Sequence, residues 1–284
     1  MNVNNIQDIY GAIIGSLNGN GADISMTQAL VSAVAMFFLV FLRVTGMFVV
    51  SPIFGRQNLP VYYKLGFSFM LSLVIVSSTA IVSPAVMGNI AEYVYFAARE
   101  FIIGASIGFI PYLMFSAIYM AGQMIDMKIG FSMVNVLDPV SNVQIPITAN
   151  FYFILCMLMF ITVNAHHMVI LTICRSYGFI PVGRINMDGE LIDTLLRLFS
   201  DIFIVGFRIA APIVFTILLT DVALGVISKA MPQINVFMVG MPLKILVGVV
   251  IMIVTMPTML MILGELFKNI GLETTNFMRG LGAQ

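Results

Sequence analysis

Charged residues are scarce in this sequence. Only 9% of its 284 residues are Asp, Glu, Lys or Arg, whereas 60% are hydrophobic. A soluble domain carries about 25% charged residues, so this chain has too few ions to cover a globular surface in water. Lipid or other apolar protein must therefore solvate it. The formal net charge is zero and there is no basic patch, which removes the electrostatic argument for a nucleic-acid partner.

Residues that carry out covalent chemistry are equally sparse. The two cysteines, Cys156 and Cys174, lie about 18 residues apart, and a continuous helix would separate them by about 27 Å, too far for a disulfide. His166 and His167 have no Cys, Asp or Glu at ligand spacing, which argues against a metal site. The sequence contains no recognisable nucleophile–base pair and no phosphate-binding loop. It therefore predicts neither an enzyme nor a bound cofactor.

The N-terminus lacks basic residues. No lysine or arginine precedes Arg43, so the basic region of a signal peptide is missing. Several apolar residues instead fall on one helical face: Ile6, Ile9, Tyr10, Ile13, Ile14 and Leu17. Residues 1–25 are expected to form an amphipathic, interfacial region.

Long apolar runs are what the sequence has in abundance. Six of them approach the roughly 20 residues that cross a hydrocarbon core. They occupy residues 29–50, 65–82, 101–120, 149–173, 202–220 and 245–263. We expect an all-α, multi-pass membrane protein whose six spanning helices form kinked hairpins. Residues 1–284 would make up a single domain that ends in a short C-terminal tail, residues 264–284.

Proline and glycine mark points of helix contact. Pro111, Pro212 and Pro257 lie inside the third, fifth and sixth runs, where each removes a backbone donor and is expected to kink its helix. Gly104 and Gly108 form a GxxxG motif in the third run, which permits close approach of a neighbouring helix. These features predict helices bent against partners.

Two arginines lie inside apolar runs. An arginine at the bilayer centre costs roughly 2.5–3.5 kcal/mol on insertion scales, so Arg43 and Arg208 need an explanation. One reading is a pathway for a substrate or ion. The favoured reading is a buried structural pair, and the carboxylates available for it are Glu100, Asp126, Asp201 and Asp221.

Two connectors between apolar runs are themselves apolar and punctuated by proline. Segment 130–146 carries one acid, Asp138, and is bounded by Gly130, Pro139 and Pro146. Segment 223–248 carries only two lysines and is interrupted by Pro232 and Pro242. Such segments suit a ring of side chains that closes a pore by excluding water. They suit re-entrant or interfacial segments without a gating role equally well.

The order of these residues resembles that of the FliR/SctT family of type III export-apparatus proteins. The resemblance runs from about residue 42 to residue 248 and rests on an ordered series rather than on one motif. The series includes Arg43, Pro52, Pro60, Lys64, Gly66, Glu100, Gly104, Gly108, Gly122, Ile125, Gly130, Asp138, Pro139, Pro146, Asn164, His166, Pro181, Gly183, Pro232, Gln233, Phe237, Gly240, Pro242 and Gly248.

The resemblance implies a non-enzymatic subunit of a bacterial protein-export gate. In that family the chain joins FliP and FliQ subunits, with FlhB and FlhA nearby, around a channel crossed by unfolded flagellar proteins. It implies a place in the bacterial inner membrane and the flagellar basal body, with part of the assembly on the periplasmic side. Apolar surface would then be buried against FliP and FliQ as well as against lipid.

The resemblance also assigns an apolar channel plug to segment 130–146. The plug candidates are Phe131, Met133, Val136 and Leu137. Methionine and valine stand where the family often has phenylalanine, so the expected seal is less aromatic. Arg43, Asp138 and the prolines are expected to hold shape rather than to perform chemistry.

Two other classes of protein remain as alternatives. A secondary transporter of a small solute could use Arg43 or Arg208 to bind an anion near mid-membrane, although no clear inverted repeat supports it. An intramembrane enzyme has the least support, because no catalytic constellation is present.

Overall fold

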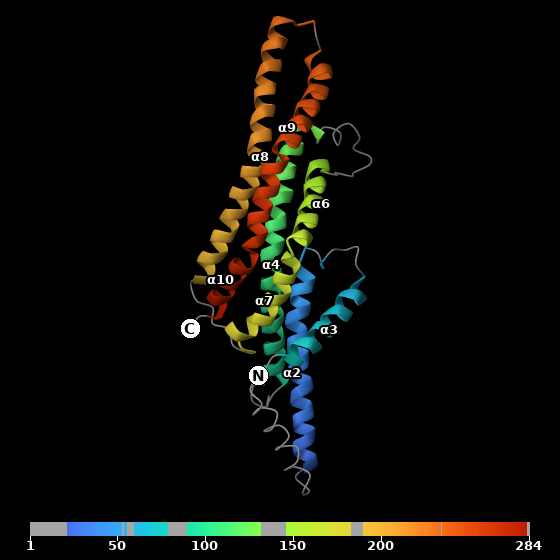
Figure 1. The fold of residues 1–284 in the computed structure, drawn as a ribbon, viewed down its shortest axis with the longest axis vertical. Coiled ribbons are helices and arrows are strands. Elements are labelled where there is room, and N and C mark those ends of the chain that lie inside the picture. The colour runs from blue at the N-terminus through green and yellow to red at the C-terminus, as the bar shows by residue number, and fades with distance from the viewer. Residues whose placement is uncertain are drawn as a thin grey trace.

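The computed structural model describes residues 22–52, 54–55, 60–78, 90–131, 146–182, 190–233 and 235–282. Nearly all of them are helical (Figure 1). The helices are α2 (Ala22–Val50), α3 (Val61–Ser78), α4 (Ile90–Ile129), α6 (Ile147–Thr162), α7 (Ala165–Phe179), α8 (Glu190–Ala230), α9 (Val236–Lys268) and α10 (Ile270–Gly282). The prediction of an all-α, multi-pass helical protein is confirmed.

Helix α4 is the central element of the molecule. α2, α6 and α8 pack along it, while α3 packs on α2, α9 on α8 and α10 on α7. Most of these helices run along one long axis, with the α8–α9 hairpin at one end and the start of α2 at the other (Figure 1). The core lies between α2, α4, α6 and α8. Its fully buried side chains include Leu39, Val44, Ile107, Cys156 and Ile213.

The prediction of six membrane spans is too high. Within the described residues, four helices are long and apolar enough to cross a membrane: Leu30–Val50, Ile90–Ile129, Leu196–Ala230 and Met238–Lys268. The run at 65–82 corresponds to α3, which is shorter. The run at 149–173 is divided between α6 and α7, and a fifth span results only if this bent pair counts as one.

The break between α6 and α7 has a local cause. Asn164 adopts the left-handed conformation, with φ of 58°, and the two helices meet at an angle of 65°. Asparagine is among the few residues with a side chain that tolerate this region. Hydropathy averaged over a window does not register the break, because the apolar residues of α6 and α7 outweigh Asn164, His166 and His167.

The prolines lie inside helices that continue past them. Pro111 is in α4, Pro212 in α8, and both Pro242 and Pro257 in α9. The missing backbone donor at each proline therefore does not end its helix. The kinks predicted at these positions stay a prediction.

The C-terminal segment 264–284 contains the end of α9 and all of α10. One face of α10 is buried, through Phe277, Met278 and Leu281, and the helix packs on α7. The segment is thus part of the fold where the structure describes it. The amphipathic helix expected from Ile6 to Leu17, within the region 1–25, lies outside the described residues.

Candidate functional site

Arg43 lies at the centre of a buried polar cluster that joins α2, α4 and α7. Its Nε donates to Oε2 of Glu100 at 2.5 Å, and its Nη2 donates to Oε1 of the same carboxylate at 3.1 Å. Nη1 donates to Oγ of Ser176 at 3.0 Å, and Nη2 also donates to the carbonyl oxygen of Ile180 at 3.1 Å. The guanidinium carbon lies 4.1 Å from the centroid of the Tyr177 ring.

Burial explains why the guanidinium of Arg43 has so many polar partners. The side chains of Arg43 and Glu100 are both 0% exposed. Removing two charges from water costs several kcal/mol for each ion, and only good geometry with further hydrogen bonds compensates for it. Glu100, rather than Asp126, Asp201 or Asp221, is therefore the partner of Arg43. A solute anion cannot reach this guanidinium without displacing the cluster.

Glycines bring α2 and α4 together directly beside the cluster. A Cβ atom at Gly104 would overlap the carbonyl oxygen of Arg43, and one at Gly108 would lie 2.5 Å from the carbonyl oxygen of Met47. On the facing helix, a Cβ at Gly46 would meet the backbone of Phe101. The two backbones cross so closely that only hydrogen fits between them, as small-residue helix contacts require.

A second buried contact fixes the start of α6. Both carboxylate oxygens of Asp126, in the last turns of α4, accept backbone hydrogen bonds: Oδ1 from Thr148 N at 2.9 Å and Oδ2 from Ala149 N at 3.2 Å. These are donors that a helix N-terminus leaves without intrahelical partners, and a carboxylate also complements the helix dipole. Gly122 leaves room for the backbone of Ala149. Asp126 thereby holds together the two ends of the connector that contains the plug candidates.

Only the edges of this connector are described. Gly130 ends α4 with φ of +102°, a conformation that favours glycine, and Phe131 is half-buried against the core. Pro146 directly precedes α6. The plug candidates Met133, Val136 and Leu137, together with Asp138 and Pro139, lie outside the described residues.

The other motif residues are dispersed over the fold. Pro52 is buried after the end of α2, whereas Pro60 is exposed. The carbonyl oxygen of Pro60 accepts a hydrogen bond from Tyr63 N at the start of α3. Lys64, also in α3, is half-buried. Pro232 and Gln233 form the exposed turn between α8 and α9. In α9, Gly240 is buried and Pro242 is exposed. The tertiary structure does not gather these residues into one site.

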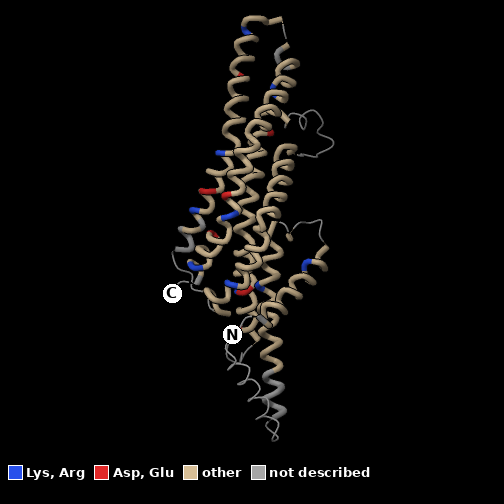
Figure 2. The backbone as a smooth tube through the Cα atoms, in the orientation of Figure 1, with Lys and Arg blue, Asp and Glu red and all other residues tan. Residues whose placement is uncertain are grey.

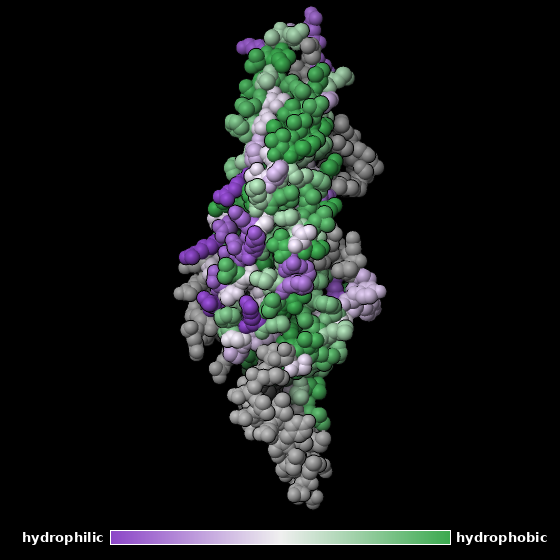
Figure 3. All heavy atoms as spheres, viewed as in Figure 1, coloured by the Kyte–Doolittle hydropathy of each residue, from purple (hydrophilic) through white to green (hydrophobic). Residues whose placement is uncertain are grey.

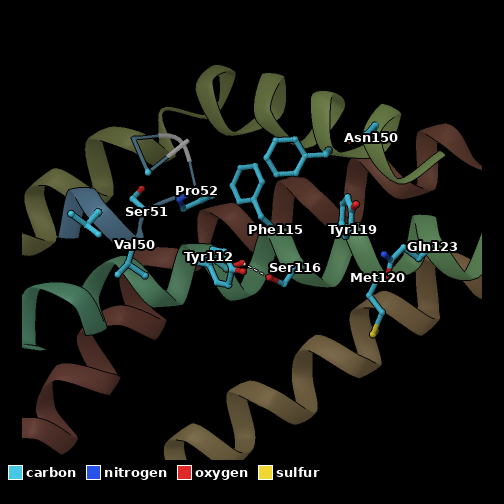
Figure 4. Close-up of a pocket in the computed structure, with 13 residues that line it drawn as sticks. Val50, Ser51, Pro52, Tyr112, Phe115, Ser116, Tyr119, Met120, Gln123 and Asn150 are labelled. Atoms are coloured by element: carbon cyan, nitrogen blue, oxygen red, sulfur yellow. Dashed lines mark hydrogen bonds between the residues drawn. The ribbon is translucent and has the colours of Figure 1, made fainter. Parts of the chain in front are cut away.

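A cavity of about 510 Å³ opens between the end of α2, the middle of α4 and the start of α6 (Figure 4). Its wall on α4 carries a stripe of uncharged polar side chains, Tyr112, Ser116, Tyr119 and Gln123, and Asn150 of α6 lies opposite. We call these four residues of α4 the polar stripe. Polar side chains of this kind are more favourably placed against water or a protein partner than against lipid.

The α8–α9 hairpin extends beyond the rest of the molecule (Figure 1). Asp221 and Lys244 form an ion pair across it, with side chains 40% and 27% exposed. Beyond this pair the exposed surface of the hairpin is mostly apolar, with hydrophilic residues, among them Lys229 and Gln233, near its turn (Figure 3). The exposed apolar residues of this tip are Val222, Val226, Ile227, Met231, Met238, Val239 and Leu243.

His166 and His167 lie in the first turn of α7, with ring centroids 4.1 Å apart. Over the part of the chain that the structure describes, no three His, Cys, Asp or Glu side chains are placed to hold a metal ion. Arg208 is on the exposed side of α8.

Sequence reasoning missed the polar stripe and the contacts that Asp126 and Ser176 make. The polar stripe has a readable signal, since residues 112, 116, 119 and 123 follow the spacing of one helical face. Asp126 and Ser176 gave no such signal, because their partners lie 22 and 133 residues away along the chain.

Comparison with known proteins accounts for the ordered motif series. The family described as "Bacterial export proteins, family 1" matches residues 34–270. The chain is 35% identical to the flagellar biosynthetic protein FliR of Bacillus subtilis, over 82% of this chain and 90% of that protein. It is 28% identical to FliR of Escherichia coli, over 83% and 89%, and 27% identical to FliR of Aquifex aeolicus, over 81% and 89%. With its apolar membrane-length helices, the chain therefore belongs to bacterial export protein family 1, the family of FliR, and is a membrane component of the flagellar export apparatus.

Proposed function

We propose that this protein forms, with FliP- and FliQ-type subunits, the channel through which unfolded flagellar proteins cross the bacterial inner membrane. FlhB- and FlhA-type subunits are its further neighbours in the basal body, and part of the assembly lies on the periplasmic side. The observation that carries the proposal is the apolar tip of the α8–α9 hairpin.

The length of the hairpin exceeds what a bilayer can cover. Between Lys244 and Glu265, α9 has an uncharged stretch of about 20 residues, or about 30 Å, which equals the thickness of a hydrocarbon core. The tip continues for nine residues of α8 beyond Asp221, or about 14 Å. A bilayer that covers the uncharged stretch of α9 therefore leaves the tip beyond Asp221 outside the hydrocarbon core. Apolar surface of this extent favours burial against other subunits.

A charged residue placed on the tip should prevent that burial. We expect the unaltered chain, co-expressed with its own FliP- and FliQ-type subunits, to recover both in an affinity purification. Val226→Glu and Val239→Glu should lower their recovery about tenfold or more, because each buries an unpaired charge in the interface. Both valines are exposed in the single chain, so its thermal unfolding should change little.

The matched control is Leu272→Glu, the same kind of change at an exposed position of α10. It should leave recovery of the partners unchanged. Failure of the unaltered chain to recover either subunit would contradict the proposed function. Full recovery by both valine variants would contradict only the role of the tip.

Within this channel, the polar stripe is proposed to face the passing polypeptide. Its side chains donate and accept hydrogen bonds without carrying charge, which suits unfolded chains of any sequence. It lies on the same helix that leads to Phe131, so the wall and the proposed plug of Phe131, Met133, Val136 and Leu137 are continuous along the chain. Among the residues that the structure describes, none that lines this cavity is charged.

Crosslinking to an arrested export substrate tests the stripe. A photoreactive residue at Ser116 or Gln123 should crosslink to a flagellar substrate fused to a domain that cannot unfold. Leu158 of α6 and Phe207 of α8 are exposed, apolar positions. The same photoreactive residue at either of them should not crosslink to the substrate. Crosslinks at the control positions alone would place the wall elsewhere while leaving the export function standing.

A further inference from the structure

A second cavity, of about 270 Å³, opens on the flank of the molecule between α4, α8 and α10. Its floor is apolar and buried, and includes Ile110, Leu113 and Ala117 of α4. Its lining also includes four polar residues, Asp201 and Arg208 of α8, Asn269, and Glu273 of α10, of which only Glu273 is partly buried. The cavity thus has an apolar floor and a rim that carries charged side chains. Figure 2 shows charged residues gathered on this flank, and Figure 3 shows hydrophilic residues there.

The charges of the rim are not paired with one another. Among the described residues, Asp201, Arg208 and Glu273 take part in neither of the two ion pairs that the structure forms. A chain with so few charges places three of them around one cavity, two carboxylates and one guanidinium. A ligand that carries both an anion and a cation would complement both signs.

The position of the cavity relative to the bilayer indicates the class of ligand. The uncharged stretch of α9 between Lys244 and Glu265 has the length of a hydrocarbon core, about 30 Å. Leu266 and Asn269, which line the cavity, come directly after its end. The rim therefore lies at the level where lipid headgroups meet the acyl chains, and arginine side chains there extend toward the headgroups.

We propose that this cavity binds a phospholipid whose headgroup carries a primary ammonium group, such as phosphatidylethanolamine. Arg208 binds the phosphate, and the ammonium donates to Asp201 and Glu273. The start of an acyl chain covers the apolar floor and the exposed face of Ile204. Phosphatidylglycerol lacks the ammonium, and the quaternary nitrogen of phosphatidylcholine has no N–H to donate. The proposal does not depend on the export function.

The absence of tryptophan from the chain allows a direct test. Ile204→Trp places the only indole beside the cavity, at a position that is 51% exposed. The full-length chain is reconstituted into vesicles of phosphatidylcholine to which brominated phosphatidylethanolamine or brominated phosphatidylglycerol is added. We expect the brominated ethanolamine lipid to quench the tryptophan fluorescence at a mole fraction about fivefold lower than the brominated glycerol lipid does. One exposed ion pair supplies a preference of about this size.

Three controls sharpen the result. Phe215→Trp, on an exposed part of α8 away from the cavity, should be quenched equally by both lipids. Adding Asp201→Asn and Glu273→Gln to Ile204→Trp should abolish the preference, and adding Arg208→Gln should weaken quenching by both lipids. Equal quenching of Ile204→Trp by the two lipids would overturn the proposal. So would loss of all quenching at Ile204→Trp in the assembled complex, since a partner subunit would then cover the rim.

Discussion

Replacing Glu100 with glutamine is expected to destabilise the folded chain by about 3–5 kcal/mol, because it leaves the charge of Arg43 buried without a counterion. Glutamine keeps the size of the side chain but can return only one neutral acceptor to the guanidinium. The measurement is thermal unfolding of the purified chain in detergent, followed by circular dichroism. A large fall in the unfolding midpoint is the expected result.

Two variants separate this effect from a general sensitivity to substitution. The double variant Arg43→Met with Glu100→Leu removes both charges together, and replacement of a buried pair by apolar residues is often close to neutral. It should therefore recover much of the loss, short of the hydrogen bonds to Ser176 and Ile180. Lys244→Met breaks the exposed pair with Asp221 and should cost at most about 1 kcal/mol. If E100Q unfolded at the same temperature as the unaltered chain, the cluster would not hold α2, α4 and α7 together.

Among the glycines that the structure describes, Gly104 is the one at which an added methyl group should be most damaging. The new Cβ would overlap the carbonyl oxygen of Arg43, which is backbone and cannot rotate away. The two helices must separate, and we expect a loss of about 3 kcal/mol or more, at the upper end for overpacked sites. The separation would also lengthen the contacts between Arg43 and Glu100.

Gly66→Ala is the matched control for this substitution. Gly66 lies inside α3, is exposed, and has no atom within 4 Å of the position a Cβ would take. Alanine there should stabilise the helix by about 0.5–1 kcal/mol. The two changes add the same methyl group, so thermal unfolding should move in opposite directions. A Gly104→Ala chain as stable as the unaltered one would show that α2 and α4 do not cross at the distance the structure gives.

These two predictions meet at one place in the fold. The backbone of Arg43 contacts Gly104, and its side chain binds Glu100 one helical turn earlier on α4. Because residues that share a contact do not behave independently, the combined variant E100Q with Gly104→Ala should lose less stability than the sum of the two.

The sequence by itself determined the class of this protein. A chain with 9% charged residues and long apolar runs cannot fold as a soluble domain, whatever its topology. The spacing of Gly104 and Gly108 likewise predicted close helix contact, because residues four apart share a helix face. The ordered motif series was enough to identify the family. All of these are properties of local pattern and composition, which need no knowledge of what packs where.

Only the tertiary structure decided which residues act together. Four carboxylates were available to Arg43, and the choice of Glu100 depends on a crossing of helices 57 residues apart in the chain. Asn164 divides a run that hydropathy reads as one span, because one left-handed residue changes the direction of the chain while the apolar residues around it keep the window average high. The two cavities, the polar stripe beside one and the unpaired charges around the other arise where three or four helices converge. Their physical basis is packing between residues far apart in the chain. Neither the spacing of apolar residues nor the composition shows which helix faces will meet.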